Sequence, residues 1–159
     1  MKIVVISDTH GDMSWWESLK PVIMSADCLF HLGDGAREAE KIQELTGKPV
    51  YCVKGNCDIA CGASSEEEVT LGGKRIFACH GNRYRVETDL YAISAAARSR
   101  EADICLYGHT HVADITNYYG VWFVNPGSLS RPRGFDRRKT YAVLETDRNG
   151  DLIPSIYTI

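Results

Sequence analysis

Residues 2–10, KIVVISDTH, begin with a run of mostly β-branched apolar residues that ends at Ser7 and Asp8. Such a run, closed by polar residues, is typical of a buried strand, here over 2–7. Helix-like and strand-like segments then alternate: helix about 13–24, strand 28–32, helix about 36–46 and strand 50–53. This order predicts βαβ units and a parallel sheet.

Proline and glycine mark where the two helices should stop. Pro21 is expected to end or kink the first helix, because proline donates no backbone hydrogen bond and its ring clashes with the preceding turn. The second helix should end before Gly47 and Pro49, which together are a typical helix stop.

After Gly62 the pattern changes to short strands joined by turns. Runs at 69–71 and 75–79 flank Gly72-Gly73, which is a two-residue hairpin signal. The other expected elements are a helix at about 87–101 and strands at 104–107, 113–118, 121–124, 139–146 and 152–158, with turns at Tyr119-Gly120 and Asn149-Gly150. We expect this half of the chain to form a second, mixed and partly antiparallel sheet.

Two such sheets bury both sets of strands when they face each other with helices outside. The expected fold class is therefore α/β, a four-layer α/β/β/α sandwich of two mixed sheets. With 159 residues, 44% of them hydrophobic, the chain is long enough to bury one core. We expect a single domain over residues 1–159.

The charge and the amino-terminal segment restrict the partners. A formal net charge of −3 provides no global positive field, so no stable nucleic-acid complex is expected. The apolar run at 2–6 is too short for a signal peptide or a membrane span. We therefore expect a soluble, unprocessed, cytoplasmic protein with no membrane partner.

The chain has six cysteines, and most of them lie in strand-like runs, which predicts reduced, buried thiols. Cys57 and Cys61 form a C-x-x-x-C pair, but no second pair completes the spacing of a structural zinc site.

Five polar clusters each fall where a strand-like run ends. They are Asp8-Thr9-His10, Gly33-Asp34, Gly55-Asn56-Cys57-Asp58, His80-Gly81 and Gly108-His109-Thr110-His111. Ligands of α/β sheets bind beyond the carboxyl ends of the strands, so these clusters are expected to converge on one cleft. His31 is the histidine outside the clusters, and its apolar strand neighbours indicate a core residue.

The clusters supply carboxylate, amide and imidazole donors, a set that suits manganese, iron, nickel, zinc or magnesium. A carboxylate such as Asp34 can bridge two ions about 3.5–4 Å apart, which together clamp a phosphoryl oxygen and lower the pKa of a shared water. Each motif alone is compatible with an ordinary turn or loop. The ordered set of five indicates a metal-dependent phosphoesterase.

The same five motifs resemble those of the calcineurin-like metallophosphoesterases. The short chain, the Gly-Asn-Cys-Asp form and Asn125-Pro126-Gly127-Ser128 resemble its small prokaryotic, YfcE-like phosphodiesterase branch. The resemblance implies one metal held by Asp8, His10, Asp34 and His111, and a second held by Asp34, Asn56, His80 and His109. It implies two divalent ions, with manganese preferred and nickel, iron, zinc or magnesium as alternatives. The implied catalytic residues are Asp34, Asn56, Cys57, Asp58 and His80.

One position departs from much of the wider family, which has a histidine where this chain has Cys57. That histidine is thought to stabilise or protonate groups on the phosphate, so the leaving-group step of this chain is open. A thiol that only fills space is the alternative.

A basic segment follows Ser128, with Arg131, Arg133, Arg137, Arg138 and Lys139 within nine residues. If this segment borders the cleft, it can attract and hold a phosphate, and we predict Ser128, Arg131 and Arg133 as substrate contacts. A solvated basic loop is the alternative.

The predicted function is a phosphoric ester hydrolase, a phosphodiesterase that cleaves a small phosphodiester substrate through hydroxide activated by two metals. The alternatives are a metal-dependent phosphomonoesterase and a protein-interaction scaffold on the same fold, such as the retromer scaffold subunit. All seven metal positions carry the expected residue types, which favours the enzyme. A homo-oligomer is compatible with the sequence, and Trp15 and Trp16 are expected either at an interface or beside the cleft.

Overall fold

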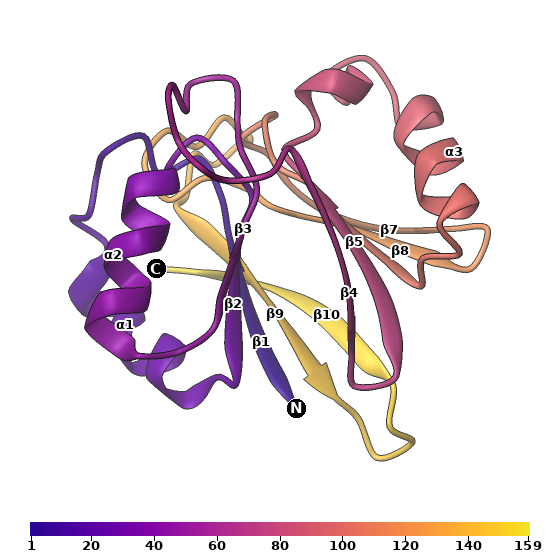
Figure 1. Ribbon diagram of the computed structural model, residues 1–159, viewed down its shortest axis with the longest axis horizontal. Coiled ribbons are helices and arrows are strands. Elements are labelled where there is room, and N and C mark those ends of the chain that lie inside the picture. The colour runs from indigo at the N-terminus through magenta and orange to yellow at the C-terminus, as the bar shows by residue number, and fades with distance from the viewer.

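The apolar run near the amino terminus forms the central strand of a five-stranded sheet. In this computed structural model, which describes residues 1–159, β1 (Lys2–Ile6) lies between β2 (Cys28–His31) and β9 (Thr140–Thr146). The sheet order is β10-β9-β1-β2-β3, with β3 at Val50–Cys52 and β10 at Leu152–Thr158. Strands β1, β2 and β3 are parallel, as the βαβ pattern predicts, and are joined through α1 (Trp16–Ser25) and α2 (Ala36–Thr46) (Figure 1).

The last two strands join this first sheet, and the expectation that the second half of the chain forms a sheet of its own was wrong for them. β9 pairs antiparallel with β1, with Val143 opposite Val4. Val143 faces the helix-side core, whereas Ala142 and Leu144 face the core between the sheets. Because β9 is apolar on both faces, it is stable only inside a sheet that is covered on both sides.

The second sheet has the order β4-β5-β6-β8-β7. Its strands are β4 (Glu66–Leu71), β5 (Lys74–Cys79), β6 (Ile104–Leu106), β7 (Ala113–Tyr118) and β8 (Val121–Pro126). The predicted hairpin at Gly72-Gly73 is confirmed, and both glycines have positive φ, +56° and +75°. This backbone suits glycine and matches the right-handed twist of the two strands.

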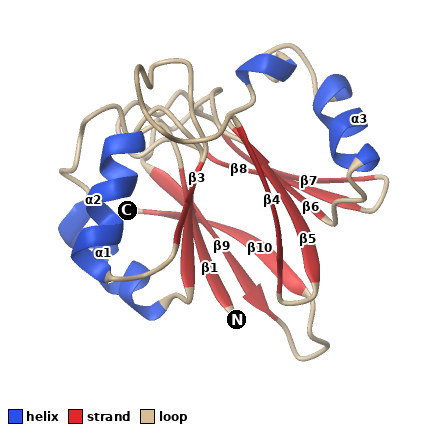
Figure 2. Ribbon diagram, viewed as in Figure 1, coloured by secondary structure: helices blue, strands red, loops and turns tan.

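Successive side chains of each strand point to opposite faces of its sheet, which gives three apolar cores. Ile3 and Val5 point into the core between the two sheets, whereas Val4 and Ile6 pack against the helix side. On the far side α3 (Tyr91–Ser99) covers the second sheet through Ile93. Figure 2 shows the two red sheets face to face, with α1 and α2 outside one and α3 outside the other. The four-layer α/β/β/α sandwich is therefore confirmed.

α2 matches the expectation and ends before Gly47, whereas α1 and α3 differ from it. α1 begins at Trp16 and continues through Pro21, because Leu19 and Ile23 on either side of the proline are buried against the first sheet. Tertiary packing here outweighs the hydrogen bond that proline cannot make. α3 is shorter than expected and follows a separate 3-10 turn at Asn82–Tyr84.

Several smaller features of the sequence have a clear place in the fold. Trp15 is buried in the helix-side core, with its indole N–H donating to Asp12 O at 2.6 Å. All six cysteines are free thiols, of which Cys28, Cys79 and Cys105 are buried. None of the helices combines the length and apolar character that a membrane span needs.

Candidate metal centre

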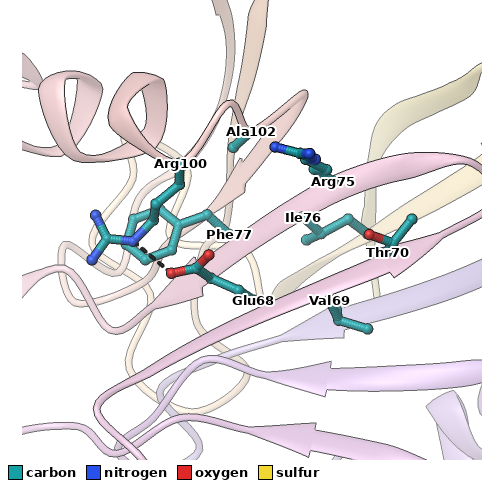
Figure 3. Close-up of a pocket in the computed structure, with 8 residues that line it drawn as sticks. All are labelled: Glu68, Val69, Thr70, Arg75, Ile76, Phe77, Arg100 and Ala102. Carbon is teal, nitrogen blue, oxygen red and sulfur yellow. Dashed lines mark hydrogen bonds and ion pairs between the residues drawn. The ribbon is translucent and has the colours of Figure 1, made fainter.

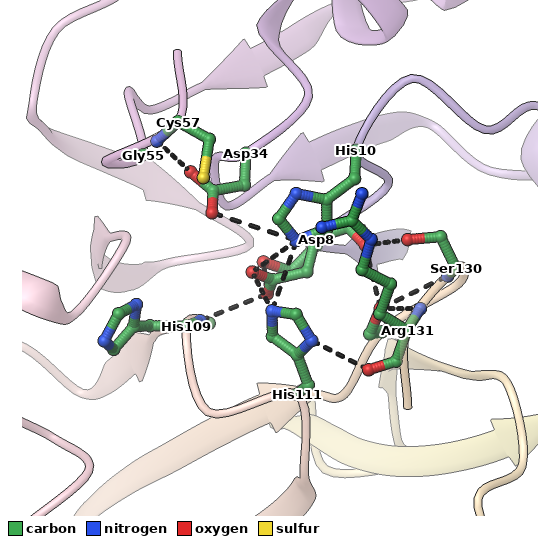
Figure 4. A network of polar contacts seen from close by, with 12 residues as sticks. Asp8, His10, Asp34, Gly55, Cys57, His109, His111, Ser130 and Arg131 are labelled. Atoms are coloured by element: carbon green, nitrogen blue, oxygen red, sulfur yellow. Dashed lines mark hydrogen bonds and ion pairs between the residues drawn. The ribbon is translucent and has the colours of Figure 1, made fainter. Parts of the chain in front are cut away.

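The five polar clusters meet at one end of the two sheets, and backbone hydrogen bonds join their loops. Asp8 N–H donates to Gly33 O at 3.0 Å and His10 N–H donates to Asp34 O at 2.8 Å. Across the two sheets, the His109 N–H donates to the Asp8 carboxylate at 3.1 Å (Figure 4). The carboxyl ends of β1, β2, β3, β5 and β6 therefore bring together side chains that are up to 103 residues apart, from Asp8 to His111.

Five of the candidate ligands have the left-handed backbone conformation that non-glycine residues rarely adopt. They are Asp8, His10, Asp34, His109 and His111, with φ between +46° and +72°. Each such residue costs of order 1 kcal/mol, and strain of this kind persists where the surrounding structure holds it for a function. The clustering of half of the ten positive-φ non-glycine residues at one site therefore marks it as functional.

A first donor group consists of Asp8, His10 and His111. The His111 Nδ1 lies 2.7 Å from Arg131 O, and because a carbonyl only accepts, Nδ1 must carry the proton. In the neutral ring Nε2 therefore presents a lone pair, 3.1 Å from Asp8 Oδ1 and 3.3 Å from His10 Nε2.

Asp8 Oδ1 is the buried side-chain oxygen that has no hydrogen-bond partner. The other oxygen, Oδ2, accepts from Ser7 at 2.6 Å and from the His109 N–H. An ionised buried oxygen without a donor costs several kcal/mol unless a cation compensates it. The donor set of the first group thus fits a divalent metal ion.

A second donor group contains His80, Asn56 and Asp34. The His80 Nδ1–H donates to Leu32 O at 2.7 Å, which leaves Nε2 as a lone pair facing Asn56 Oδ1 at 3.1 Å and Asp34 Oδ2 at 3.6 Å. The His109 ring lies edge-on to His80, with ring centroids 5.1 Å apart, and its Nε2 is 3.6 Å from Glu87 Oε2.

Asp34 lies between the two donor groups. Its Oδ2 is 3.9 Å from His10 Nε2 on one side and 3.6 Å from His80 Nε2 on the other. Its Oδ1 is occupied, because it accepts the Cys57 N–H at 2.7 Å. Oδ2 is thus free for a cation, and its position is suited to a bridging carboxylate.

The imidazole pKa values differ across the site. Burial lowers the pKa of His10, although Asp34 and Asp8 oppose this, and burial beside His80 lowers that of His109. Burial also acts to lower the pKa of His111, but the Asp8 carboxylate outweighs it and the pKa is raised. Of these three imidazoles, His111 is therefore the one at which a proton competes most strongly with a metal.

Asp58, which we predicted as a catalytic residue, has a supporting position. Its carboxylate accepts four backbone N–H groups, those of Asp34, Gly35, Ala36 and Gly55, at 2.7–3.0 Å. Burial acts to raise its pKa, but these hydrogen bonds outweigh the burial and lower it. Both oxygens accept these hydrogen bonds, so Asp58, which lies in the wall of the cleft, joins the loops that carry Asp34 and Asn56.

Cys57 lies at the mouth of the site. Its sulfur is within 4.8 Å of the nearest donor atoms of His10 and Asp34. Burial and the Asp34 carboxylate raise the pKa of the thiol to about 11, so it is neutral near pH 7. The cleft here has a volume of about 640 Å³, and His10, Asp34, Cys57 and Arg131 are among the residues that line it.

The predicted substrate contacts separate into two kinds. Ser128 is fully buried; its hydroxyl donates to Asp8 O at 2.8 Å and accepts the Arg131 N–H at 2.8 Å, so it supports the site from behind. Arg131 is exposed, lines the cleft and lies beside His10 in Figure 4. Arg133 is exposed and its N–H donates to His111 O at 3.0 Å.

The rest of the basic segment is partly occupied elsewhere. Arg138 pairs with Asp136 at 3.0 Å and Lys139 with Asp12 at 3.3 Å. Arg131 and Arg133 are thus the members closest to the donor groups, and neither forms an ion pair.

Sequence reasoning missed residues that hold the ligands without contacting a metal. The Asn125 side chain donates to Gly108 O and to the Thr110 hydroxyl, both at 3.0 Å, and so shapes the loop of His109 and His111. Gly108 is required because a Cβ there would lie 2.9 Å from Asp8 Oδ2. The Asn125 motif was the only signal of this support in the sequence.

A second cavity, of about 170 Å³, lies on the outer face of the second sheet near the end of α3 (Figure 3). Arg100 packs over the Phe77 ring at 4.5 Å and pairs with Glu66 and Glu68 at 2.7 and 2.9 Å. None of the predicted metal ligands lines this cavity, and both of its arginines are compensated, Arg75 by Glu101 and Arg100 by the two glutamates. We therefore place the chemistry in the cleft at the strand ends.

Comparison with known proteins agrees with this site. The model of the calcineurin-like phosphoesterase superfamily domain matches residues 1–149. The chain is 30% identical to the probable metallophosphoesterase YsnB of Bacillus subtilis, covering 94% of this chain and 86% of that protein. It is 28% identical to the phosphodiesterase YfcE of Escherichia coli K12, covering 92% and 89%.

A solved structure of a similar protein has the same fold. The crystal structure of a predicted phosphoesterase from Streptococcus pneumoniae is 30% identical, covers 99% of this chain and 97% of that chain, and superposes with a TM-score of 0.81. The matched family, the shared fold and the converging donor groups together show that this chain belongs to the calcineurin-like phosphoesterase superfamily, in its YfcE-like branch.

Proposed function

We propose that the protein is a metal-dependent phosphodiesterase that hydrolyses phosphodiester bonds with two divalent ions, preferably manganese. Asp8, His10, Asp34 and His111 would hold one ion, and Asp34, Asn56, His80 and His109 the other. The observation that carries the proposal is the uncompensated donor set: Asp8 Oδ1 has no hydrogen bond, and His80 and His111 each present a lone pair to a carboxylate. Two divalent ions bound by these residues would polarise a phosphoryl oxygen and make hydroxide available near neutral pH.

The chain's own groups then bind and orient the substrate. The Arg131 guanidinium borders the cleft and can donate to the non-bridging phosphate oxygens. The Cys57 thiol is a weaker hydrogen-bond donor than an imidazolium, and it therefore gives less help to a poor leaving group. These properties favour a diester, which carries less charge than a monoester, and an acidic leaving group.

The direct test is a screen of metals against matched esters. Purified protein is stripped of metal, reloaded with manganese, nickel, iron, zinc or magnesium, and assayed with bis(p-nitrophenyl) phosphate and with p-nitrophenyl phosphate. We expect metal-dependent cleavage, with a higher kcat/KM for the diester. Higher monoester activity with every metal would instead identify a phosphomonoesterase.

A protein-interaction scaffold is the competing function on this fold. Zinc-bound Vps29 of Entamoeba histolytica covers 99% of this chain with a TM-score of 0.79, but at 20% identity that likeness shows the fold alone. A scaffold does not require a strained, complete donor set. Protein that neither binds metal nor cleaves any ester in the screen would support the scaffold.

Metal affinity and activity are expected to fall as the pH decreases below about 6.5. The pKa of His111 is raised above its usual value, so a proton occupies Nε2 first as the pH falls, while His10 and His109 protonate later because their pKa values are lowered. Each imidazole that must lose a proton weakens metal binding about tenfold per pH unit below its pKa. Manganese titrations and kcat/KM from pH 5 to 8 check this, with thermal unfolding at each pH as the control. A flat profile down to pH 5 would contradict it.

Replacing Cys57 with histidine is expected to raise monoesterase activity relative to diesterase activity. The exposed sulfur lies beside His10 and Asp34, so an imidazolium there would place a cationic donor near the leaving oxygen and the additional charge of a monoester. The measurement is the ratio of kcat/KM for the two nitrophenyl esters at equal metal content, with Cys57→Ser as the control for loss of the thiol. An unchanged ratio would show that Cys57 does not determine substrate choice, and the basic segment that begins at Arg131 would be the next one to test.

A further inference from the structure

Glu38, on α2, is a buried carboxylate that the proposed chemistry does not use. It is 8% exposed and forms no ion pair. Its Oε1 accepts two hydrogen bonds, from the Thr9 hydroxyl at 2.8 Å and from the Gly11 N–H at 2.5 Å. A buried carboxylate without a cation is uncommon, so its hydrogen bonds need a physical account.

The hydrogen bonds behind Glu38 have a defined direction. Gly33 N–H donates to His31 Nδ1 at 3.3 Å, so the proton of the neutral ring is on Nε2. The Nε2–H therefore donates to the Thr9 oxygen at 3.0 Å, and the Thr9 hydroxyl has to donate onward to Glu38. His31 is fully buried, and burial lowers its pKa to about 4, which keeps the ring neutral.

This chain of hydrogen bonds ends on the loop that carries two candidate ligands. Thr9 lies between Asp8 and His10, and Gly11 follows His10, so Glu38 contacts the residues that alternate with the ligands. Asp8 and His10 have φ of +55° and +46°, a conformation that needs restraint from outside the loop. Gly35 packs directly against these side chains and leaves no room for a larger residue, because a Cβ on Gly35 would lie 2.7 Å from His31 Nε2.

We propose that Glu38 is a positioning residue, which through Thr9 and Gly11 holds Asp8 and His10 where they bind the first metal ion. The inference rests on the proposed metal-dependent function. His31 is the buried start of this chain of hydrogen bonds, and its Nε2–H orients the Thr9 hydroxyl toward Glu38. The role requires an acceptor oxygen at Oε1 and does not require the charge.

This requirement separates positioning from a general effect of charge or stability. Glu38→Gln keeps an acceptor oxygen, whereas Glu38→Ala removes it and leaves the Thr9 hydroxyl and the Gly11 N–H without a partner. Glu44→Gln is the matched control, because Glu44 is exposed on the same helix, does not line the cleft, and its replacement removes the same charge. A purely structural residue would lower the unfolding temperature without altering the affinity of the folded protein for metal.

The experiment titrates metal-free protein with manganese by calorimetry and with cobalt by its visible absorption. We expect Glu38→Ala to weaken binding of the first ion about 10- to 100-fold, which is typical for partners that orient metal ligands. Glu38→Gln and Glu44→Gln should stay close to wild type, and Glu38→Ala should change the cobalt spectrum. If Glu38→Ala binds both metals as tightly as wild type, the inference is overturned while the proposed function stands. If wild-type protein binds no metal, the proposed function itself fails.

A second pair of variants applies if Glu38→Ala does not fold. Thr9→Val has nearly the same shape but lacks the hydroxyl that joins His31 to Glu38, and Thr9→Ser retains it. We expect weaker manganese binding for Thr9→Val and recovery for Thr9→Ser. Equal affinities for the two variants would overturn the positioning role.

Discussion

Asp34→Asn is expected to lower kcat/KM by at least about a thousandfold, equivalent to about 4 kcal/mol of barrier, and to remove at least one of two bound metal ions. Oδ2 of Asp34 lies 3.9 Å from His10 Nε2 and 3.6 Å from His80 Nε2, between the two donor groups. Without its negative charge, two cations at short range would repel each other with little compensation. Metal content per folded protein and kcat/KM for a nitrophenyl diester measure the effect.

The amide should preserve the local structure, because Oδ1 can still accept the Cys57 N–H. Asp27→Asn is the matched control and should retain wild-type activity and metal content, because Asp27 is exposed and precedes β2, at the opposite end of the sheet from the site. Full metal content with near-normal turnover in Asp34→Asn would rule out a bridging role.

The two histidines of the second donor group should respond differently to alanine. His80→Ala is expected to lower kcat/KM at least about a hundredfold and also to destabilise the fold by about 1–3 kcal/mol. His80 is 1% exposed and its Nδ1–H donates to Leu32 O, so its removal leaves that buried carbonyl without its donor.

His109→Ala should reduce activity while the unfolding temperature stays close to wild type, because the side chain is 25% exposed and belongs to none of the apolar cores. Thermal unfolding, metal content and kcat/KM of both variants check the difference. If His109→Ala keeps full metal content and activity, the residue is only a partner of Glu87 at the rim of the cleft.

The sequence predicted the location of the site more accurately than the roles of its residues. Polar residues that interrupt apolar runs are visible in one dimension, and the parallel arrangement of β1 and β2 necessarily brings Asp8 and Asp34 to the same edge. The roles of Asp58 and Ser128 were not visible in this way. Each carries a functional group that suits catalysis, but the structure commits Asp58 to backbone N–H groups and buries Ser128 completely.

The sequence by itself determined the elements and the layers, because the periodicity of apolar residues states which faces must be buried. It also determined the donor types at the ends of the strands. Only the tertiary structure decided which sheet β9 joins, because an apolar strand satisfies its own pattern in either sheet and the choice depends on the open edge of β1. Likewise, only the fold brought Glu38 to Thr9 and His31, because hydrogen bonds between residues up to 29 positions apart leave no periodic signal in the chain.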